Sequence, residues 1–287
     1  MLDAIVTVAA TDWSAALGGL VSELEAGKLL FFPSLRFQMD RDEAALLRPD
    51  VRDPKSRNIS LRPDGRLVGA AVTGPEHGRL CAMIGRFAHQ ARSLIDAIAP
   101  SYRAHLRVAP ASLRPTQVES RQQSWRADDR RLHVDAFPSR PNRGERILRV
   151  FTNVNPHDEA RVWRVGEPFD AIARHFVPRA KRYTPWQAQA LKTLRVTKSL
   201  RSEYDHLMLQ LHDGMKADLA YQRDCPQLTH AFPPGSTWVC FSDQTAHAAM
   251  SGQYMMEQTL HLPAKYQCNP QASPLAILER QLGRRLT

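Results

Sequence analysis

The spacing of apolar positions predicts helices in the first part of the chain. Apolar residues recur at three- and four-residue steps over 13–30 and over about 76–107, as on the buried face of an amphipathic helix. Pro100 is expected to break the second of these helices. The apolar run at 29–32, followed by proline, predicts a short buried strand, and turn signals over 40–75 indicate loops with short strands.

From about residue 118 the pattern changes to short strands. A β-rich stretch over 146–154 predicts one of them. Thr184-Pro185 suits an N-cap and first helical turn, and opens a helical insertion that runs to about 222. A last helix begins at Ser273-Pro274. The other strands are expected at 160–165, 228–232, 237–242, 246–250 and 253–262.

Strands that are grouped apart from the helices argue against a Rossmann or TIM-barrel architecture and favour an α+β chain, with a β-sandwich or jelly roll packed by helices. We expect a single domain over 1–287. Its parts are a mainly helical front over 1–117, a jelly-roll core over 118–268 with the helical insertion at about 184–222, and a C-terminal helix over 269–287. Neither GxGxxG nor GxxxxGK[ST] occurs, which removes the usual nucleotide-binding loops.

Charge indicates the class of partner. Lys and Arg number 39 against 29 Asp and Glu, for a formal net charge of +10. Such a surface attracts nucleic acid, anionic lipid headgroups or an acidic sugar, and composition alone does not choose among them.

The cysteines and the apolar runs indicate the compartment. Four cysteines lie far apart without a CxxC pair, which argues against a zinc ribbon or a disulfide framework and fits a reducing cytoplasm. No apolar stretch approaches the roughly 20 residues that span a bilayer. We therefore expect a cytoplasmic protein without a transmembrane segment.

The candidate chemistry lies at His133-Val134-Asp135. Residues i and i+2 of a strand project from one face, so His133 and Asp135 can bind one metal ion together. His247, on a predicted late strand, can supply a second imidazole. Two histidines and one carboxylate leave three coordination positions open, as in the facial triad of non-heme Fe(II) oxygenases.

Two other interpretations of these residues stay open. A His-x-Asp match is expected by chance in a chain of this composition, so these histidines can instead be hydrogen-bonded structural residues. His157-Asp158-Glu159 is a competing cluster, but it lies in a polar loop that would hold ligands less rigidly.

The stretch 131–140 (RLHVDAFPSR), with the run 146–156, resembles the Kdo hydroxylases within the Fe(II)/2-oxoglutarate-dependent oxygenases. The resemblance spans most of the chain and includes 232–235 and 242–247. It implies a double-stranded β-helix (jelly-roll) core, Fe(II) as the metal, and 2-oxoglutarate and O2 as cosubstrates. It also implies His133, Asp135 and His247 as the iron ligands.

The same resemblance implies a reaction. Kdo hydroxylases hydroxylate carbon 3 of 3-deoxy-D-manno-oct-2-ulosonic acid (Kdo) on Kdo-containing lipid A precursors and give Ko, an inner-core modification of lipopolysaccharide. The alternatives are an oxygenase acting on another small molecule or on a protein, and a cupin-like metal- or sugar-binding module without turnover. A nucleic-acid-binding protein that uses the +10 surface is the third.

One departure from the wider superfamily concerns the cosubstrate. Many such oxygenases carry an Arg about ten residues after the distal His, but positions 248–260 contain neither Arg nor Lys. A carboxylate in a dry cavity needs a cation, which must then come from another strand. Arg149 is the first candidate and Arg164 the second, with Asn153 beside Arg149 on its strand.

The substrate and its location follow from the resemblance and the charge. A Kdo-bearing lipid is anionic, and the candidate residues for its charged groups are Arg114, Arg121, Arg126 and Arg140. The partner is then a Kdo-containing lipid A precursor at the membrane surface rather than nucleic acid. Peripheral contact with the cytoplasmic face of the inner membrane and a homo-oligomer through the final helix remain open.

Overall fold

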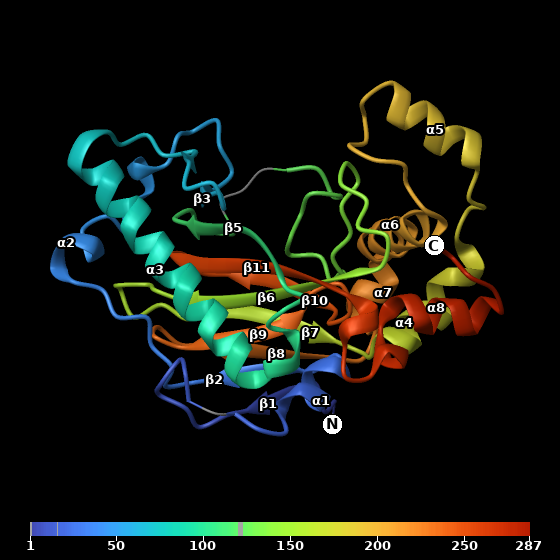
Figure 1. Cartoon of the computed structure of the whole chain (residues 1–287), viewed down its shortest axis with the longest axis horizontal. Helices are drawn as coiled ribbons and strands as arrows, with labels where there is room; N and C mark the ends of the chain where they lie inside the picture. Colours follow the sequence, from blue (N-terminus) through green and yellow to red (C-terminus); the bar gives the residue numbers. More distant parts are fainter. Residues whose placement is uncertain (1, 16, 120–122) are drawn as a thin grey trace.

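The computed structural model describes residues 2–15, 17–119 and 123–287 (Figure 1). Within these ranges the strands form an eight-stranded sheet in the order β1-β2-β9-β6-β11-β5-β3-β4 and a three-stranded sheet in the order β10-β7-β8. All neighbours pair antiparallel except β1 and β2. The strands are β1 (Ile5–Thr7), β2 (Leu29–Phe32), β3 (Ile59–Leu61), β4 (Leu67–Val68), β5 (Arg107–Arg114), β6 (Glu145–Asn153), β7 (Arg161–Gly166), β8 (Gln227–Phe232), β9 (Thr237–Phe241), β10 (His247–Ser251) and β11 (Met255–Pro263).

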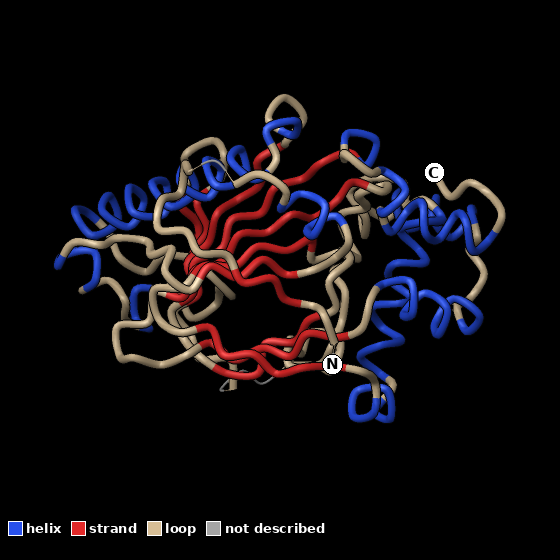
Figure 2. The backbone as a smooth tube through the Cα atoms, turned by 90° about the horizontal axis from the view of Figure 1, so that it is seen from below, coloured by secondary structure: helices blue, strands red, loops and turns tan. Residues whose placement is uncertain are grey.

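The two sheets lie as facing layers, which Figure 2 shows edge-on. Aromatic side chains from both sheets meet between them. The rings of Phe151 and Trp163 are 5.0 Å apart, and those of Phe232 and Trp238 are 4.1 Å apart. These contacts fill one part of the space between the layers with a dry core.

Helix α3 (Gly74–Ile98) covers the outer face of the large sheet. Its apolar stripe packs against Leu148 and Val150 of β6, among others. Because successive strand residues point to opposite faces, Arg149 and Phe151 of β6 point to the inner side, toward the small sheet. Helix α3 therefore fixes which residues of β6 can reach the space between the sheets.

The helical insertion and the C-terminal helix build a second core. Leu132 and Val134, which flank His133, are fully buried in this core beside Leu211 and Met215 of α6. The helices concerned are α4 (Phe169–Phe176), α5 (Pro185–Thr193), α6 (Glu203–Ala217), α7 (Leu219–Asp224) and α8 (Pro274–Leu282). Two further short helices are α1 (Leu20–Glu25) and α2 (Arg41–Ala44), and single 3-10 turns occur at Pro49–Val51, Pro100–Tyr102, Val177–Arg179, Ala264–Tyr266 and Pro270–Ala272.

The mixed α/β architecture, the helices within 184–222 and the last helix agree with the sequence prediction, but the front of the chain differs. Among the described residues of 13–30, only α1 is helical, and Gly18 and Gly19 delay its start. Helix α3 ends before Pro100, and the predicted continuation to 107 forms a 3-10 turn at Pro100–Tyr102 and a loop that leads into β5. Residues 1–117 also contribute β1 to β5 to the large sheet, beside the helices predicted there. Pro110 within β5 and partners distant in sequence hid this strand from the pattern.

Among the described residues, no helix has the length and apolar character needed to cross a membrane.

Candidate active site

Backbone pairing brings His133 and His247 together. The N–H of each donates to the carbonyl of the other, over 3.0 and 2.9 Å, and the Asp135 N–H donates to the Ser242 carbonyl over 2.8 Å. The segment around His133 was predicted as a strand, but it forms a single isolated bridge. The extended backbone still places His133 and Asp135 on the same side, while Leu132 and Val134 face the helical core.

His133, Asp135 and His247 form a cluster with the geometry of a metal site. Each offers one ligand atom, and these atoms lie within 4.8 Å of one another. Nδ1 of His133 is 2.7 Å from the Arg131 carbonyl and Nδ1 of His247 is 2.9 Å from the Thr245 carbonyl. Each Nδ1–H can donate there, which would leave both Nε2 atoms to bind a metal, since metal-ligating histidines usually donate their other ring N–H in this way. The donor set therefore fits Fe(II), with three positions left open.

The electrostatics of the cluster suit a metal ion. Burial lowers the pKa of both His133 and His247, so their imidazoles are neutral and keep a lone pair for a metal. Burial is the largest single effect on Asp135 and opposes its ionisation. The Arg149 guanidinium, whose Nη2 is 3.1 Å from Asp135 Oδ2, and the other polar groups around the carboxylate together outweigh burial and hold the pKa of Asp135 well below its usual range. Asp135 is therefore an anion at neutral pH.

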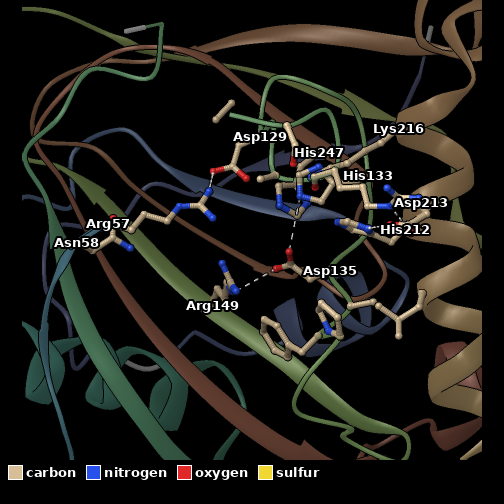
Figure 3. A pocket seen from close by; sticks show the side chains of 18 of the residues that line it. Arg57, Asn58, Asp129, His133, Asp135, Arg149, His212, Asp213, Lys216 and His247 are labelled. Carbon is tan, nitrogen blue, oxygen red and sulfur yellow. Dashed lines mark hydrogen bonds and ion pairs between the residues drawn. The ribbon is translucent and has the colours of Figure 1, made fainter. Parts of the chain in front are cut away.

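The cluster faces a cavity of about 730 Å³ (Figure 3). Aromatic residues Phe151 and Trp163 line one part of it, and the ring of Trp163 stacks on His247 with centroids 5.2 Å apart. Cations outnumber carboxylates among the described residues that line this cavity. The cations are Arg57, Arg114, Arg126, Arg149, Arg161, Arg201 and Lys216, and the carboxylates are Asp129, Asp135 and Asp213. Such a wall favours anionic ligands.

Of the three residues predicted for the cosubstrate, only Arg149 lines the cavity. Arg164 donates to the carbonyls of Gln222 and Arg130, both over 2.9 Å. Asn153 donates to the carbonyls of Glu159 and Phe232, both over 3.0 Å. Both side chains bond to backbone carbonyls and do not line the cavity, so the structure does not place them with Arg149.

Strand alternation explains why Arg164 of β7 does not reach the cavity. Trp163 points into the cavity, so Arg164 points to the other face of the small sheet and Arg161 points inward. Arg161 is buried, and its Nη1 donates to the Gly252 carbonyl over 3.0 Å. The sequence prediction missed Arg161, although the parity of Trp163 could have indicated it.

The residues predicted for the substrate divide into three groups. Arg114 and Arg126 line the cavity. Arg140 is exposed and lines a much smaller pocket that shares Asp135 with the cavity. Arg121 lies outside the described residues. His157, Asp158 and Glu159, the competing cluster, lie outside the cavity wall and away from His133, Asp135 and His247.

Helix α6 contributes five cavity residues that the sequence did not single out, and two of them, His212 and Lys216, lie near the cluster. His212 and Lys216 are four positions apart and so share one face of the helix. The ring of His212 is 5.3 Å from that of His133, and its Nδ1 is 3.0 Å from Asp213 Oδ1. Helical spacing predicts that His212 and Lys216 share one face of a helix. The sequence does not show that this face points to the cluster of His133, Asp135 and His247.

Lys216 is a buried cation. The residue is 2% exposed, and its Nζ donates over 2.9 Å to the Arg126 carbonyl. It forms no ion pair with any residue in the described ranges. Burial lowers the pKa of this ammonium, while Asp129 and Asp135 oppose the shift from farther away. The cavity therefore holds a cation that lacks an adjacent anion.

Comparison with known proteins identifies the family. A family model described as 3-deoxy-D-manno-oct-2-ulosonic acid (Kdo) hydroxylase matches residues 10–285. A crystal structure of the Kdo hydroxylase KdoO, a non-heme Fe(II) α-ketoglutarate-dependent dioxygenase, in complex with α-ketoglutarate and Fe(III) is 39% identical, with a TM-score of 0.93 over 99% of this chain and 97% of that one. The cobalt(II) complex of KdoO is also 39% identical, with a TM-score of 0.95 and the same coverage. Comparison with curated protein sequences gives no match. The fold matches that of KdoO, and the chain belongs to the Kdo hydroxylase family.

Proposed function

We propose that this chain is an Fe(II)/2-oxoglutarate-dependent dioxygenase that hydroxylates carbon 3 of Kdo on a Kdo-lipid A precursor and gives Ko. The observation that carries this proposal is the buried cluster of His133, Asp135 and His247 in a cavity whose wall is rich in cations. The similarity to KdoO, solved with α-ketoglutarate and Fe(III) and also with succinate, supports the same cosubstrate and product here.

The residues of the chain position the reactants. Bound Fe(II) and 2-oxoglutarate supply the oxidising chemistry by which O2 converts a C–H bond to a C–OH group and 2-oxoglutarate to succinate and CO2. His133, Asp135 and His247 would hold the metal and leave positions for the cosubstrate. Phe151 and Trp163 exclude water from that side of the cavity.

We also propose that the strands form a double-stranded β-helix (jelly roll) within a single domain over 1–287. In chain order, β5, β6, β9 and β11 lie in the large sheet, while the segment at His133, β7, β8 and β10 lie on the side of the small sheet. This alternation between layers supports the jelly-roll winding. Its first strand is β5, so the proposed core begins before the boundary at 118.

Lys216 is the proposed partner of the Kdo carboxylate. That carboxylate is bonded to carbon 2, next to the methylene at carbon 3, so it must bind close to the metal when carbon 3 is attacked. Lys216 and His212 lie on one face of α6, and the ring of His212 is in contact distance of metal-ligand His133. A buried ammonium without an ion pair gains most from an incoming carboxylate.

Replacing Lys216 separates substrate binding from cosubstrate turnover. Lys216→Met is expected to raise the KM for the Kdo-lipid on the order of a hundredfold, because a charge-assisted contact of about 2–3 kcal/mol is lost. Substrate-independent consumption of 2-oxoglutarate should persist, and Tm should not fall, because an unpaired buried charge has been removed. Lys265→Met, which lies outside the cavity wall, is the matched control. An unchanged KM with the Kdo-lipid would contradict this role.

The reaction itself is tested by mass spectrometry. Purified protein with Fe(II), 2-oxoglutarate and O2 is expected to add the mass of one oxygen atom to the Kdo region of a Kdo-lipid A precursor. Added salt should slow the reaction, because it screens the attraction between the anionic lipid and the cationic surface. Hydroxylation of a peptide or a small acid, with no oxidation of Kdo under the same conditions, would contradict Kdo as the substrate. The assignment to the oxygenases would then still hold. Absence of any 2-oxoglutarate consumption would favour a binding protein without turnover.

A further inference from the structure

The insertion carries a segment of unusual charge. Residues 181–198, which we call the basic arm, contain five Lys or Arg and no Asp or Glu. The arm includes α5 and the turns that follow it, and α5 projects from the body of the molecule beyond α6 (Figure 1). A stretch of like charge repels itself, and on a projecting element it suits an anionic partner.

The arm also exposes large apolar side chains. Trp186 is 68% exposed and Leu194 is 73% exposed, and Val196 is exposed beside them. Trp186, Ala190 and Leu194 follow one another at four-residue steps, which places them along one side of α5 and its C-terminal turn. An exposed tryptophan beside exposed aliphatic residues is typical of a surface that enters a membrane interface.

The cations of the arm are unengaged by acidic groups. Within the part of the chain that the structure describes, no ion pair involves its cationic residues, which are Lys181, Arg182, Lys192, Arg195 and Lys198. By contrast, two arginines just before the arm are paired, Arg174 with Asp170 and Arg179 with Asp218. The charges of the arm are therefore available to an external anion.

The root of the arm lies at the rim of the cavity. The Lys198 N–H donates to the Ser139 carbonyl over 2.9 Å, and Arg201 Nη2 donates to the Pro138 carbonyl over 2.8 Å. Arg201, Pro138 and the adjacent Phe137 all line the cavity. A surface that contacts the arm is consequently held next to the opening that leads to the metal cluster.

We propose that the basic arm docks the protein on an anionic phospholipid bilayer, with Trp186 and Leu194 among the headgroups and the cations at lipid phosphates. The proposal rests on the proposed function only in taking the substrate to be a lipid, since bilayer contact needs no catalysis. A second copy of the chain fits poorly, because the arms would oppose like charges. Nucleic acid would engage the cations but would leave the aliphatic side chains in water.

Cosedimentation of the metal-loaded protein with vesicles tests this docking. Binding is expected to vesicles of phosphatidylglycerol and phosphatidylethanolamine, and to be much weaker to vesicles of phosphatidylcholine alone. Trp186→Ser with Leu194→Ser should weaken the binding about tenfold or more through lost apolar contact. Lys192→Gln with Arg195→Gln should weaken it about tenfold and reduce its salt dependence. The matched control is Val68→Ser with Val108→Ser, which changes exposed apolar residues of β4 and β5. This control should leave the binding to anionic vesicles unchanged.

Activity assays distinguish failure of this proposal from failure of the proposed function. The arm variants should retain turnover of detergent-dispersed Kdo-lipid and lose turnover of the same lipid embedded in vesicles. If the protein does not hydroxylate Kdo, cosedimentation still measures whether the basic arm binds vesicles. Equal binding of the arm variants and the unchanged protein to anionic vesicles would overturn the proposal. So would arm variants that alter only oligomeric state or affinity for a DNA or RNA probe.

Discussion

Each of His133→Ala, Asp135→Ala and His247→Ala is expected to abolish the consumption of 2-oxoglutarate and to reduce bound Fe(II) or Co(II) to background. The physical reason is that two imidazoles and one carboxylate make up the whole protein-derived donor set of the cluster. Metal content and succinate formation measure the two effects directly.

Folding should survive these substitutions. The three side chains line a cavity, and their neighbours Leu132 and Val134 carry the packing of this segment. His247→Ala also removes the ring under Trp163, so a loss of about 1 kcal/mol of stability is expected there. His157→Ala is the control, since His157 is the histidine of the competing cluster and lies outside the cavity wall. If one of the three variants keeps full metal content and turnover, the metal must be bound by other residues.

The cluster of His133, Asp135 and His247 could be predicted from the sequence because its geometry is local. Residues i and i+2 of an extended segment share a face whether or not a full strand forms, so the single bridge at His133 changed nothing for Asp135. His247 required only a late strand that lies next to this segment. Strand alternation also places Arg149 on the inner face of β6, because it alternates with Leu148 and Val150, which pack under α3. Its predicted role toward 2-oxoglutarate stays a proposal, and its contact with Asp135 was not predicted.

Residues whose position depends on docking could not be predicted. Lys216 is on an amphipathic helix, and the sequence does not tell which polar position of α6 faces the metal cluster. Arg161 and Arg164 lie on the same strand with opposite parity, and choosing between them needs the inward direction of Trp163. Strand β5 was missed for a related reason, since its pairing with β11 and β3 joins distant parts of the chain.

Arg149→Ala is expected to weaken the binding of 2-oxoglutarate by about 2–5 kcal/mol, roughly 30- to 5000-fold, if Arg149 binds a cosubstrate carboxylate as we propose. Arg149 is buried between two acidic residues, with Nη2 3.1 Å from Asp135 Oδ2 and Nη1 3.2 Å from Glu257 Oε1. Glu257 also pairs with Arg114 and so does not depend on Arg149 alone. Two arginines facing these carboxylates, together with a divalent metal, leave two positive charges, which match the dianion of 2-oxoglutarate.

The same contact makes Arg149 a positioning residue for Asp135, and the measurement must separate the two roles. In the metal-free protein, Arg149→Ala leaves Asp135 as a buried carboxylate without its partner, which should lower stability by about 3–5 kcal/mol. Bound metal replaces that partner and should restore most of the loss. Metal affinity should fall by only about 10–100-fold, as for other residues that orient a ligand. Calorimetric titration of 2-oxoglutarate into Co(II)-loaded protein, without O2, therefore isolates cosubstrate binding.

Variants of two further arginines test whether Arg149 binds 2-oxoglutarate. Arg164→Ala removes hydrogen bonds to backbone carbonyls outside the cavity and should leave the affinity for 2-oxoglutarate unchanged. Arg161 lines the cavity beside Trp163, on the strand of the small sheet that faces Arg149. If Co(II)-loaded Arg149→Ala binds 2-oxoglutarate normally and Arg161→Ala does not, the carboxylate anchor lies on β7, and Arg149 serves only to hold Asp135 toward the metal.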